Sequence, residues 1–247
     1  MSAQLWLYIF IALIILNFIF SNVLEYLNDK NWKDEIPNEL KGYYDKKKYL
    51  EARDYKKSRG KVSLISSILT TVLTIFFLSS GAYGFVSDYV YEFNSSSFIH
   101  SAIFFLIFYF VNLIITIPIN YYSIFIIEEK FGFNKTTLRT FFMDVIKGSL
   151  MSLFIGGLLL AAAIFLYDYF TKDFWIWLWL GLSLFVVFMS MFYTTLIVPI
   201  FNKLSPLENG TLKDKIENYS KEIGYSLKNI FIIDGSRRST KANAYFS

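Results

Sequence analysis

The 247-residue sequence contains no cysteine, one histidine and only four prolines. Without cysteine it can form no disulfide and no thiolate metal site. Charged residues are also scarce, at 18%, and a net charge of +4 is too small to indicate a nucleic-acid-binding protein. Apolar residues instead make up 55% of the chain and aromatic residues 20%, with a mean hydropathy of +0.43. This composition excludes a disordered protein, a coiled coil, a disulfide scaffold and an ordinary soluble domain.

The apolar residues are collected into five long segments that carry no charge. A helix that crosses a bilayer needs about 20 mostly apolar residues. We therefore predict transmembrane helices at 4–24, 62–84, 98–121, 147–167 and 174–198. The first segment lacks a basic start and a small-residue cleavage site, so we interpret it as a retained helix rather than a signal peptide. The predicted fold class is an α-helical integral membrane protein with five transmembrane helices.

Lysine and arginine alternate in number from one connection to the next. Residues 25–61 hold eleven of them, the next connection has none, the third has four, the fourth has one, and the tail after Asn202 has eight. Basic connections are retained on the cytoplasmic side. The pattern predicts an N-terminus outside, and a basic loop 25–61 and a C-terminal tail in the cytoplasm.

The basic loop carries its own helical signals. Pro37 is placed to open a helix, and Asn38–Arg59 mixes apolar and charged residues at helical spacing. Two interpretations remain open: the basic run lies on anionic lipid headgroups, or the loop is a solvated amphipathic helical hairpin.

Polar residues inside the predicted spans are few. No charged residue lies near the middle of a span, which argues against a transporter. Packing and interhelical hydrogen bonds explain Asn112 and Asn120, and Pro118 predicts a kink between them. His100, at the start of the third span, is interpreted as an interfacial residue, because a lone histidine does not make a zinc site.

The tail after the fifth span predicts a small α+β module. Leu212, Ile216, Tyr219 and Ile223 lie on one helical face, and Gly224 is placed to end that helix. Two strands are predicted beyond it, at 229–234 and 242–246. We expect a membrane region at 1–200 and the beginning of a larger cytoplasmic domain at 201–247, because so small a module seldom folds alone.

Three stretches of the sequence carry a resemblance to a known family. They are IIEEKFGFNKTT at Ile126–Thr137, VPIFNKLSPL at Val198–Leu207 and LKNIFIIDGSRRSTKANAYF at Leu227–Phe246. With the five spans, they resemble the N-terminal half of the type I CAAX prenyl proteases. These are integral-membrane zinc metallopeptidases that trim prenylated C-terminal CAAX proteins.

The resemblance implies that Asn243, Ala244, Tyr245 and Phe246 line the substrate groove. An exposed strand edge can bind an extended peptide through its backbone. The alternative is that Asn243 caps a turn while the two aromatic residues pack in a core.

The basic residues just before this segment also have two interpretations. Arg237, Arg238 and Lys241 either attract an anionic peptide terminus or headgroups, or belong to a solvated hairpin tip.

One departure from the family is large. Its zinc is held by a His-Glu-x-x-His helix and a later glutamate, and this chain contains no such motif. We therefore expect Zn²⁺ in the complete family enzyme, but no catalytic or metal-binding residue and no proteolysis in this chain alone.

The resulting prediction is the membrane portion of a zinc metalloendopeptidase that processes CAAX-type or other membrane-associated peptides. Its expected partners are the lipid bilayer, a hydrophobic or prenylated peptide and a separately encoded catalytic half. A compact chain without retention or transit signals favours a bacterial plasma membrane. The alternative is a non-catalytic membrane protein that binds such peptides or partners a catalytic half.

Overall fold

A computed structural model describes the chain except for residues 1, 39–40, 44, 94–95 and 246–247. Among the described residues, five helices are long and apolar enough to cross a membrane, which confirms the predicted class. They are Ala3–Asn31, Lys46–Ser79, Ser97–Glu128, Leu138–Phe170 and Phe174–Phe201. By internal contacts the chain divides into two compact units, unit 1 at residues 1–134 and unit 2 at residues 135–247. The division expected near residue 200 concerns the membrane boundary and stays a prediction.

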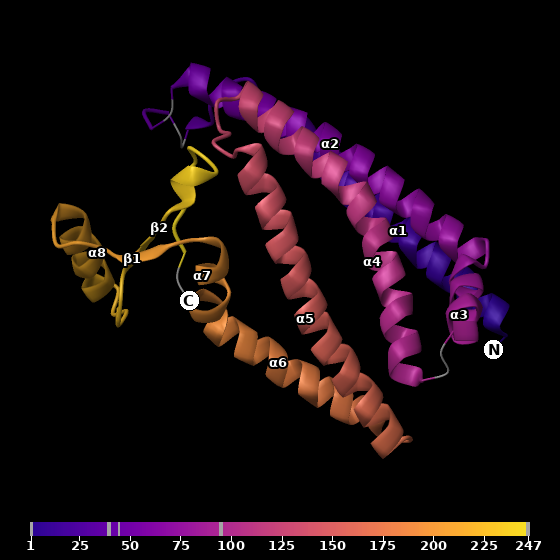
Figure 1. Cartoon of the computed structure of the whole chain (residues 1–247). Helices are drawn as coiled ribbons and strands as arrows, with labels where there is room; N and C mark the ends of the chain where they lie inside the picture. The colour runs from indigo at the N-terminus through magenta and orange to yellow at the C-terminus, as the bar shows by residue number, and fades with distance from the viewer. Residues whose placement is uncertain (1, 39–40, 44, 94–95, 246–247) are drawn as a thin grey trace. The chain divides into compact units, whose positions relative to one another are not determined.

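In unit 1, α1 (Ala3–Asn31) packs along α2 (Lys46–Ser79), as Figure 1 shows. The helix expected over 38–59 is confirmed in part: Asn38, directly after Pro37, is 3-10 helical, residues 41–43 are not helical, and α2 begins at Lys46 and continues without interruption into the membrane segment. The carboxylate of Asp45 caps this helix by accepting from the backbone N–H groups of Lys47 and Lys48, at 2.7 and 3.3 Å. No proline follows within α2, so nothing stops it until Ser79.

The length of α2 places part of it outside the bilayer. Its 34 residues correspond to about 51 Å, well above the about 30 Å of a hydrocarbon core. The charged half, which precedes Val62, therefore extends beyond a hydrocarbon core as a continuation of the same helix, and its Lys56 lies 3.1 Å from Asp29 of α1. Whether it lies on headgroups or in solvent stays a prediction.

A short helix that we did not predict, α3 (Ala82–Phe93), follows α2. Gly81 separates the two helices with a φ of +74°, a backbone conformation that favours glycine. The predicted span 62–84 is therefore too long at its end, since α2 stops at Ser79. Helix α3 packs against α2 and α4, and its Val90 is only 2% exposed.

The third span, α4 (Ser97–Tyr122), contains Pro118 and continues directly into a π-helical segment, η2 (Ser123–Glu128). A π-helical turn inserts an extra residue and shifts the side chains that follow it around the helix. Ile127 and Glu128 become buried at this point.

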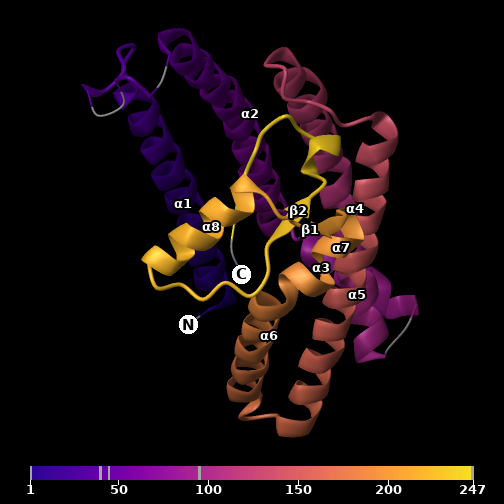
Figure 2. The same cartoon turned by 90° about the vertical axis from the view of Figure 1, so that its left-hand side faces the viewer.

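In unit 2, α5 (Leu138–Phe170) and α6 (Phe174–Leu196) form a helical hairpin (Figure 2). A further single turn, α7 (Val198–Phe201), follows α6 after a break at Ile197. Pro199 lies in its first turn, where a missing N–H costs no helical hydrogen bond.

The tail forms a two-stranded antiparallel sheet from β1 (Leu204–Pro206) and β2 (Phe231–Ile233). Between them lies α8 (Thr211–Glu222), which ends before Gly224 as predicted, and η3 (Gly235–Arg237) follows β2. Strand β2 lies within the first predicted strand, 229–234, so that prediction is confirmed in part.

The second predicted strand is wrong over 242–245, where the backbone has no regular structure, and Phe246 lies outside the described residues. The actual partner of β2 is the segment around Pro206, where the sequence pattern indicates only a break. Proline can end an edge strand because its missing N–H costs no ladder bond there.

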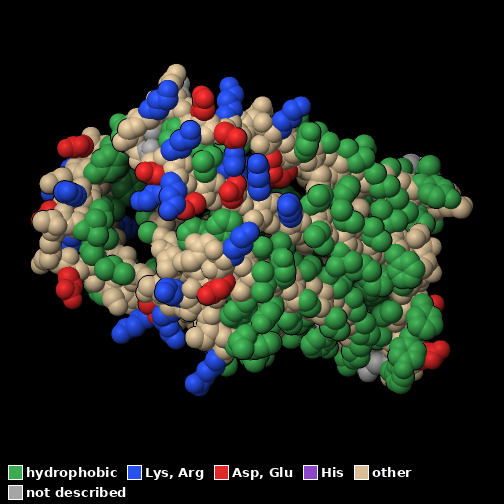
Figure 3. Space-filling view, turned by 90° about the horizontal axis from the view of Figure 1, so that it is seen from above, with side chains coloured by type: hydrophobic (Ala, Val, Ile, Leu, Met, Phe, Trp, Pro, Cys, Tyr) green, Lys and Arg blue, Asp and Glu red, His purple; other side chains and the backbone are tan. Residues whose placement is uncertain are grey.

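Apolar side chains cover large parts of the surface. Figure 3 shows wide areas of hydrophobic side chains with few charged groups among them. The described residues include only four buried apolar side chains, Val90, Ile127, Phe141 and Val198. Apolar helix faces of this kind contact lipid rather than water, so the surface fits a protein that resides in a bilayer.

Candidate functional site

The guanidinium of Arg238, just after η3, is the centre of a hydrogen-bond network in unit 2. Its Nε and Nη2 donate to the two carboxylate oxygens of Asp144 on α5, at 2.7 and 2.8 Å. Its Nη1 donates to Oδ1 of Asn202 at 2.8 Å, and Nη2 also donates to the carbonyl oxygen of Phe201 at 2.9 Å. The guanidinium is therefore held by the chain itself, and neither interpretation offered for it from the sequence is correct.

The backbone of Arg238 is held as well. Its carbonyl oxygen accepts from the backbone N–H of Lys135 at 3.0 Å and from the hydroxyl of Thr136 at 3.1 Å. Lys135 and Thr136 belong to the first of the three resembling stretches, Asn202 to the second and Arg238 to the third. The structure thus brings all three stretches together at one residue.

The charges around Arg238 favour its ionised form. Hydrogen bonding to Asp144 raises the pKa of Arg238 above its ordinary value, burial works against this shift, and the charges of Asp144 and Asp234 add to it. A planar guanidinium that donates twice to one carboxylate is a geometrically specific pair. Its neighbour Arg237 differs, since its side chain is 66% exposed and its Nη1 reaches only Asp234, at 3.4 Å.

The segment expected to bind substrate follows this anchored residue. Residues 241–245 are exposed and irregular, and the backbone N–H of Ala244 donates to Oδ1 of Asn243 at 2.9 Å. This bond joins adjacent residues, and residues 241–245 form no turn. Tyr245 is 53% exposed. The assignment of Asn243, Ala244, Tyr245 and Phe246 to a substrate groove stays a prediction, and Phe246 lies outside the described residues.

A second cluster, in unit 1, was missed in the sequence. The buried carboxylate of Glu128 in η2 accepts from the hydroxyl of Tyr55 and, at 2.9 Å, from Nη1 of Arg59, both on α2. The ring of Tyr55 stands edge-on to Phe131 and Phe133, with centroids 5.3 and 5.0 Å away. This cluster fastens the projecting half of α2 to the end of the third span.

One signal of this cluster was present in the sequence. A pair of adjacent glutamates, Glu128 and Glu129, ends an uncharged span opposite a strongly basic loop. The π-helical shift that buries the first of them has no comparable sequence signal.

The residues present do not fit a catalytic zinc ion. No group of three His, Asp or Glu residues that could hold a metal is found in the described part of the chain. The one histidine of the sequence, His100, has its Nε2 3.0 Å from the carbonyl oxygen of Ser87 and 3.2 Å from its hydroxyl. Zinc enzymes use three protein ligands, so we derive no chemical step through zinc from these residues.

Comparison with known proteins gives a consistent result. "CAAX prenyl protease 1" of Saccharomyces cerevisiae is 29% identical over 254 residues, which cover 98% of this chain and 56% of the relative. "Probable CAAX prenyl protease 1" of Schizosaccharomyces pombe is 32% identical over 232 residues, covering 87% and 48%. The crystal structure of S. mikatae Ste24p matches with a TM-score of 0.85 and 30% identity, over 98% of this chain and 58% of that one. The chain thus spans about half the length of these relatives.

The relatives also bear on location. These three proteins are eukaryotic, so they give no support to the bacterial plasma membrane expected from the sequence. The five spans make the chain a multi-pass integral membrane protein. Residues 25–203 match the family model described as the CAAX prenyl protease N-terminal domain with five membrane helices, and the chain belongs to this family.

Proposed function

We propose that this chain is the membrane-spanning portion of a CAAX prenyl protease-type zinc metalloendopeptidase, which processes prenylated or other membrane-associated peptides. The observation that carries the proposal is the network at Arg238. It joins the three family stretches and fixes the chain immediately before the exposed segment 241–245.

The proposal gives distinct roles to neighbouring residues. Arg238 holds its own backbone in place through hydrogen bonds to Asp144 and Asn202. The segment that follows it therefore begins at a fixed position. Residues 241–245 are exposed and form no strand, and on becoming extended their backbone would pair with an extended peptide. The side chain of Tyr245, half exposed, would contact the bound peptide.

The hydrolytic chemistry lies outside these residues. Zinc, held by a His-Glu-x-x-His helix on a continuation of the protein or on a separately encoded half, would supply the activated water. This chain would bind and orient the peptide and, by itself, would not cleave it. Its tail and basic loop would face the cytoplasm, where the positive-inside rule puts them.

The alternative is a non-catalytic membrane protein that binds hydrophobic or prenylated peptides. The two functions differ in one respect: a catalytic half added to the chain restores hydrolysis only if the chain is part of the protease.

A photo-crosslinking experiment tests the proposed substrate segment. A farnesylated peptide with a benzophenone group is irradiated with the purified chain in lipid nanodiscs, and the crosslinks are mapped by mass spectrometry. We expect crosslinks within residues 239–247, their loss with Tyr245→Ala, and their retention with Tyr219→Ala, which removes a tyrosine on α8 that is 63% exposed against 53% for Tyr245. Crosslinks spread over the membrane helices and unaffected by Tyr245→Ala would refute the assignment.

A further inference from the structure

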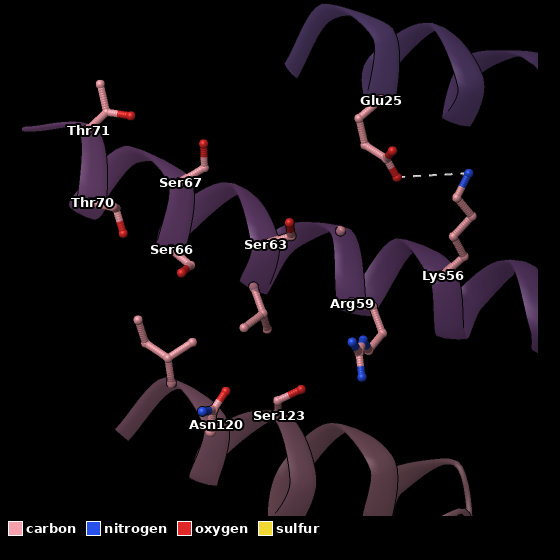
Figure 4. A pocket seen from close by; sticks show the side chains of 13 residues that line it. Glu25, Lys56, Arg59, Ser63, Ser66, Ser67, Thr70, Thr71, Asn120 and Ser123 are labelled. Atoms are coloured by element: carbon pink, nitrogen blue, oxygen red, sulfur yellow. Dashed lines mark ion pairs between the residues drawn. The ribbon is translucent and has the colours of Figure 1, made fainter. Parts of the chain in front are cut away.

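Two faces of α2 are turned toward other helices of unit 1 (Figure 4). Lys56 reaches across to α1, where its Nζ lies 3.1 Å from Asp29 and 3.9 Å from Glu25. Arg59 points toward the α4–η2 helix, and its Nη1 donates to the carboxylate of Glu128 at 2.9 Å. These two cations and three carboxylates are therefore paired with one another inside the protein.

A third face of α2 is exposed. It carries two lysines followed by three apolar residues, at the spacing i, i+4, i+7, i+11 and i+15 that places side chains on one helix face. We call this set the α2 stripe: Lys57, Lys61, Leu64, Ile68 and Val72. Both lysines are exposed, and the three apolar side chains are 44%, 45% and 58% exposed. The stripe thus passes directly from a basic surface to an apolar one.

The end of α2 fixes the depth of the stripe in the bilayer. From Val62 to Ser79 the helix is about 27 Å long, which is no more than a hydrocarbon core of about 30 Å requires. Val62 therefore lies at the edge of the core or within it. Lys61 and Lys57 precede it by about 2 and 7 Å along the helix axis. Because a headgroup layer is about 5–7 Å thick, both amines lie at the depth of the lipid phosphates.

The protein itself does not neutralise the lysines of the stripe. In the part of the chain that the structure describes, neither Lys57 nor Lys61 forms an ion pair. The nearest acidic residue before them on α2, Asp54, accepts from Nε and Nη2 of Arg53 at 3.3 and 3.2 Å. No Asp or Glu follows Asp54 in α2. A negative group placed between the two amines would therefore be attracted by both.

A phospholipid supplies both parts of a ligand that matches the stripe. Its phosphate lies at the depth of Lys57 and Lys61, and its acyl chains lie at the depth of the three apolar residues. The long lysine side chains can keep their stems on apolar surface while the amines reach the phosphate. A zwitterionic lipid carries its own cation next to the phosphate, whereas an anionic lipid does not. The two lysines therefore favour an anionic lipid.

We propose that the α2 stripe binds an anionic phospholipid of the bilayer, with the phosphate between Lys57 and Lys61 and the acyl chains against the apolar residues. The lysines farther out do not belong to this site. Lys47 and Lys48 precede Val62 by about 21 Å or more, well beyond the Debye length of about 8 Å at physiological ionic strength. The inference does not depend on the proposed function, because it concerns lipid and not the peptide substrate.

Quenching by brominated lipids measures which lipid lies on the stripe. Because the chain contains no cysteine, Ile68→Cys can carry a single fluorophore in nanodiscs. Phe20→Cys on α1 is the control reporter, because it is 66% exposed and the hydrogen bond from Asn22 to Ser67, at 3.3 Å, places it at a similar depth. Dibrominated phosphatidylglycerol and phosphatidylcholine are compared, which gives their relative association constant at each reporter.

We expect a preference for phosphatidylglycerol of about fivefold or more at Ile68→Cys, and of less than about twofold at Phe20→Cys. The preference at Ile68→Cys should fall as salt is added, because ions screen the lysines. Equal association of the two lipids at Ile68→Cys, or the same preference at both reporters, would overturn the proposal.

Matched variants separate the site from a general attraction to the basic loop. With the Ile68→Cys reporter, Lys57→Gln together with Lys61→Gln should reduce the preference to less than about twofold. Lys47→Gln together with Lys48→Gln removes the same charge from the same helix and should leave the preference unchanged. Lys57→Arg together with Lys61→Arg should retain it. Equal losses in the two glutamine variants, or a preference that persists without Lys57 and Lys61, would contradict the proposal.

A soluble headgroup separates a lipid site from a site for phosphate alone. Glycerophosphoglycerol has the phosphodiester of the lipid but no acyl chains. In large excess it should leave the quenching by brominated phosphatidylglycerol at Ile68→Cys unchanged, whereas unbrominated phosphatidylglycerol should relieve it. Equal relief by the two compounds would show that the apolar part of the stripe contributes nothing, which would overturn the proposal.

Discussion

Arg238 and Asp144 are 94 residues apart in the sequence, yet the guanidinium of one donates to both carboxylate oxygens of the other, at 2.7 and 2.8 Å. Asp144 lies near the start of a membrane-crossing helix, and Arg238 lies in the polar tail. Their side chains are only 26% and 28% exposed, so solvent screens the pair incompletely. This contact holds the proposed substrate segment to α5.

Replacing Arg238 tests this anchor. Arg238→Gln removes the two bonds to Asp144 and leaves its carboxylate without that partner, which should cost about 2 kcal/mol of apparent unfolding free energy in detergent. Hydrogen exchange should also accelerate in residues 239–245. Arg237→Gln is the neighbouring control and should change stability by less than about 0.5 kcal/mol. Equal effects of the two substitutions would contradict the assigned anchor.

The cluster at Glu128 gives a second pair of matched variants. Glu128→Gln removes a charge that Arg59 and Tyr55 both contact, so we expect a loss of about 1–2 kcal/mol in thermal or denaturant unfolding. The value is moderate because Arg59 is half exposed. Glu129→Gln, which alters a carboxylate bound to the side-chain amide of Asn134, should have a smaller effect. A reversed order would show that α2 is not fastened through Glu128.

Two glycines near α3 should respond to alanine in opposite directions. Gly81 has a φ of +74°, so Gly81→Ala should destabilise the protein by about 1 kcal/mol, although the added Cβ meets no neighbour within 4 Å. Gly84 lies inside α3 with no positive φ, and Gly84→Ala should stabilise by up to about 0.5 kcal/mol. Thermal unfolding in micelles measures both, and unchanged or raised stability of Gly81→Ala would argue against the break between α2 and α3.

The orientation in the membrane can be measured with single cysteines. Lys47→Cys, in the projecting half of α2, and Lys228→Cys, in the tail, should be labelled from the same side of intact cells or vesicles. Asp88→Cys, in α3, should be labelled from the other side. Labelling of the tail and α2 from opposite sides would overturn the predicted topology.

The five spans could be predicted because the length of an uncharged apolar segment can be read from the local composition of the sequence alone. The same local pattern did not show where helices end outside the membrane. Asp45 extends α2 far into the basic loop, and Gly81 divides the predicted span from α3. Both effects depend on single residues at helix ends. A search for apolar segments does not take such residues into account.

The candidate site was only partly predictable. The resemblance identified the three stretches, but not that Arg238 joins them or that Asp144 holds Arg238, because a lone aspartate at the start of a span has no motif. The strand pairing was also mistaken, since Pro206 suggested a break where β1 pairs with β2. Contacts between residues distant in sequence decided both cases.

The most direct test of the account is reconstitution of hydrolysis. This chain is expressed in yeast membranes that lack CAAX protease activity, alone and together with the C-terminal part of the Saccharomyces cerevisiae relative that it does not match. We predict cleavage of a farnesylated CAAX peptide only when both parts are present, with loss of activity after chelator treatment and recovery with Zn²⁺. Chelator-sensitive cleavage by this chain alone, or no cleavage by a stable complex of the two parts, would contradict the account.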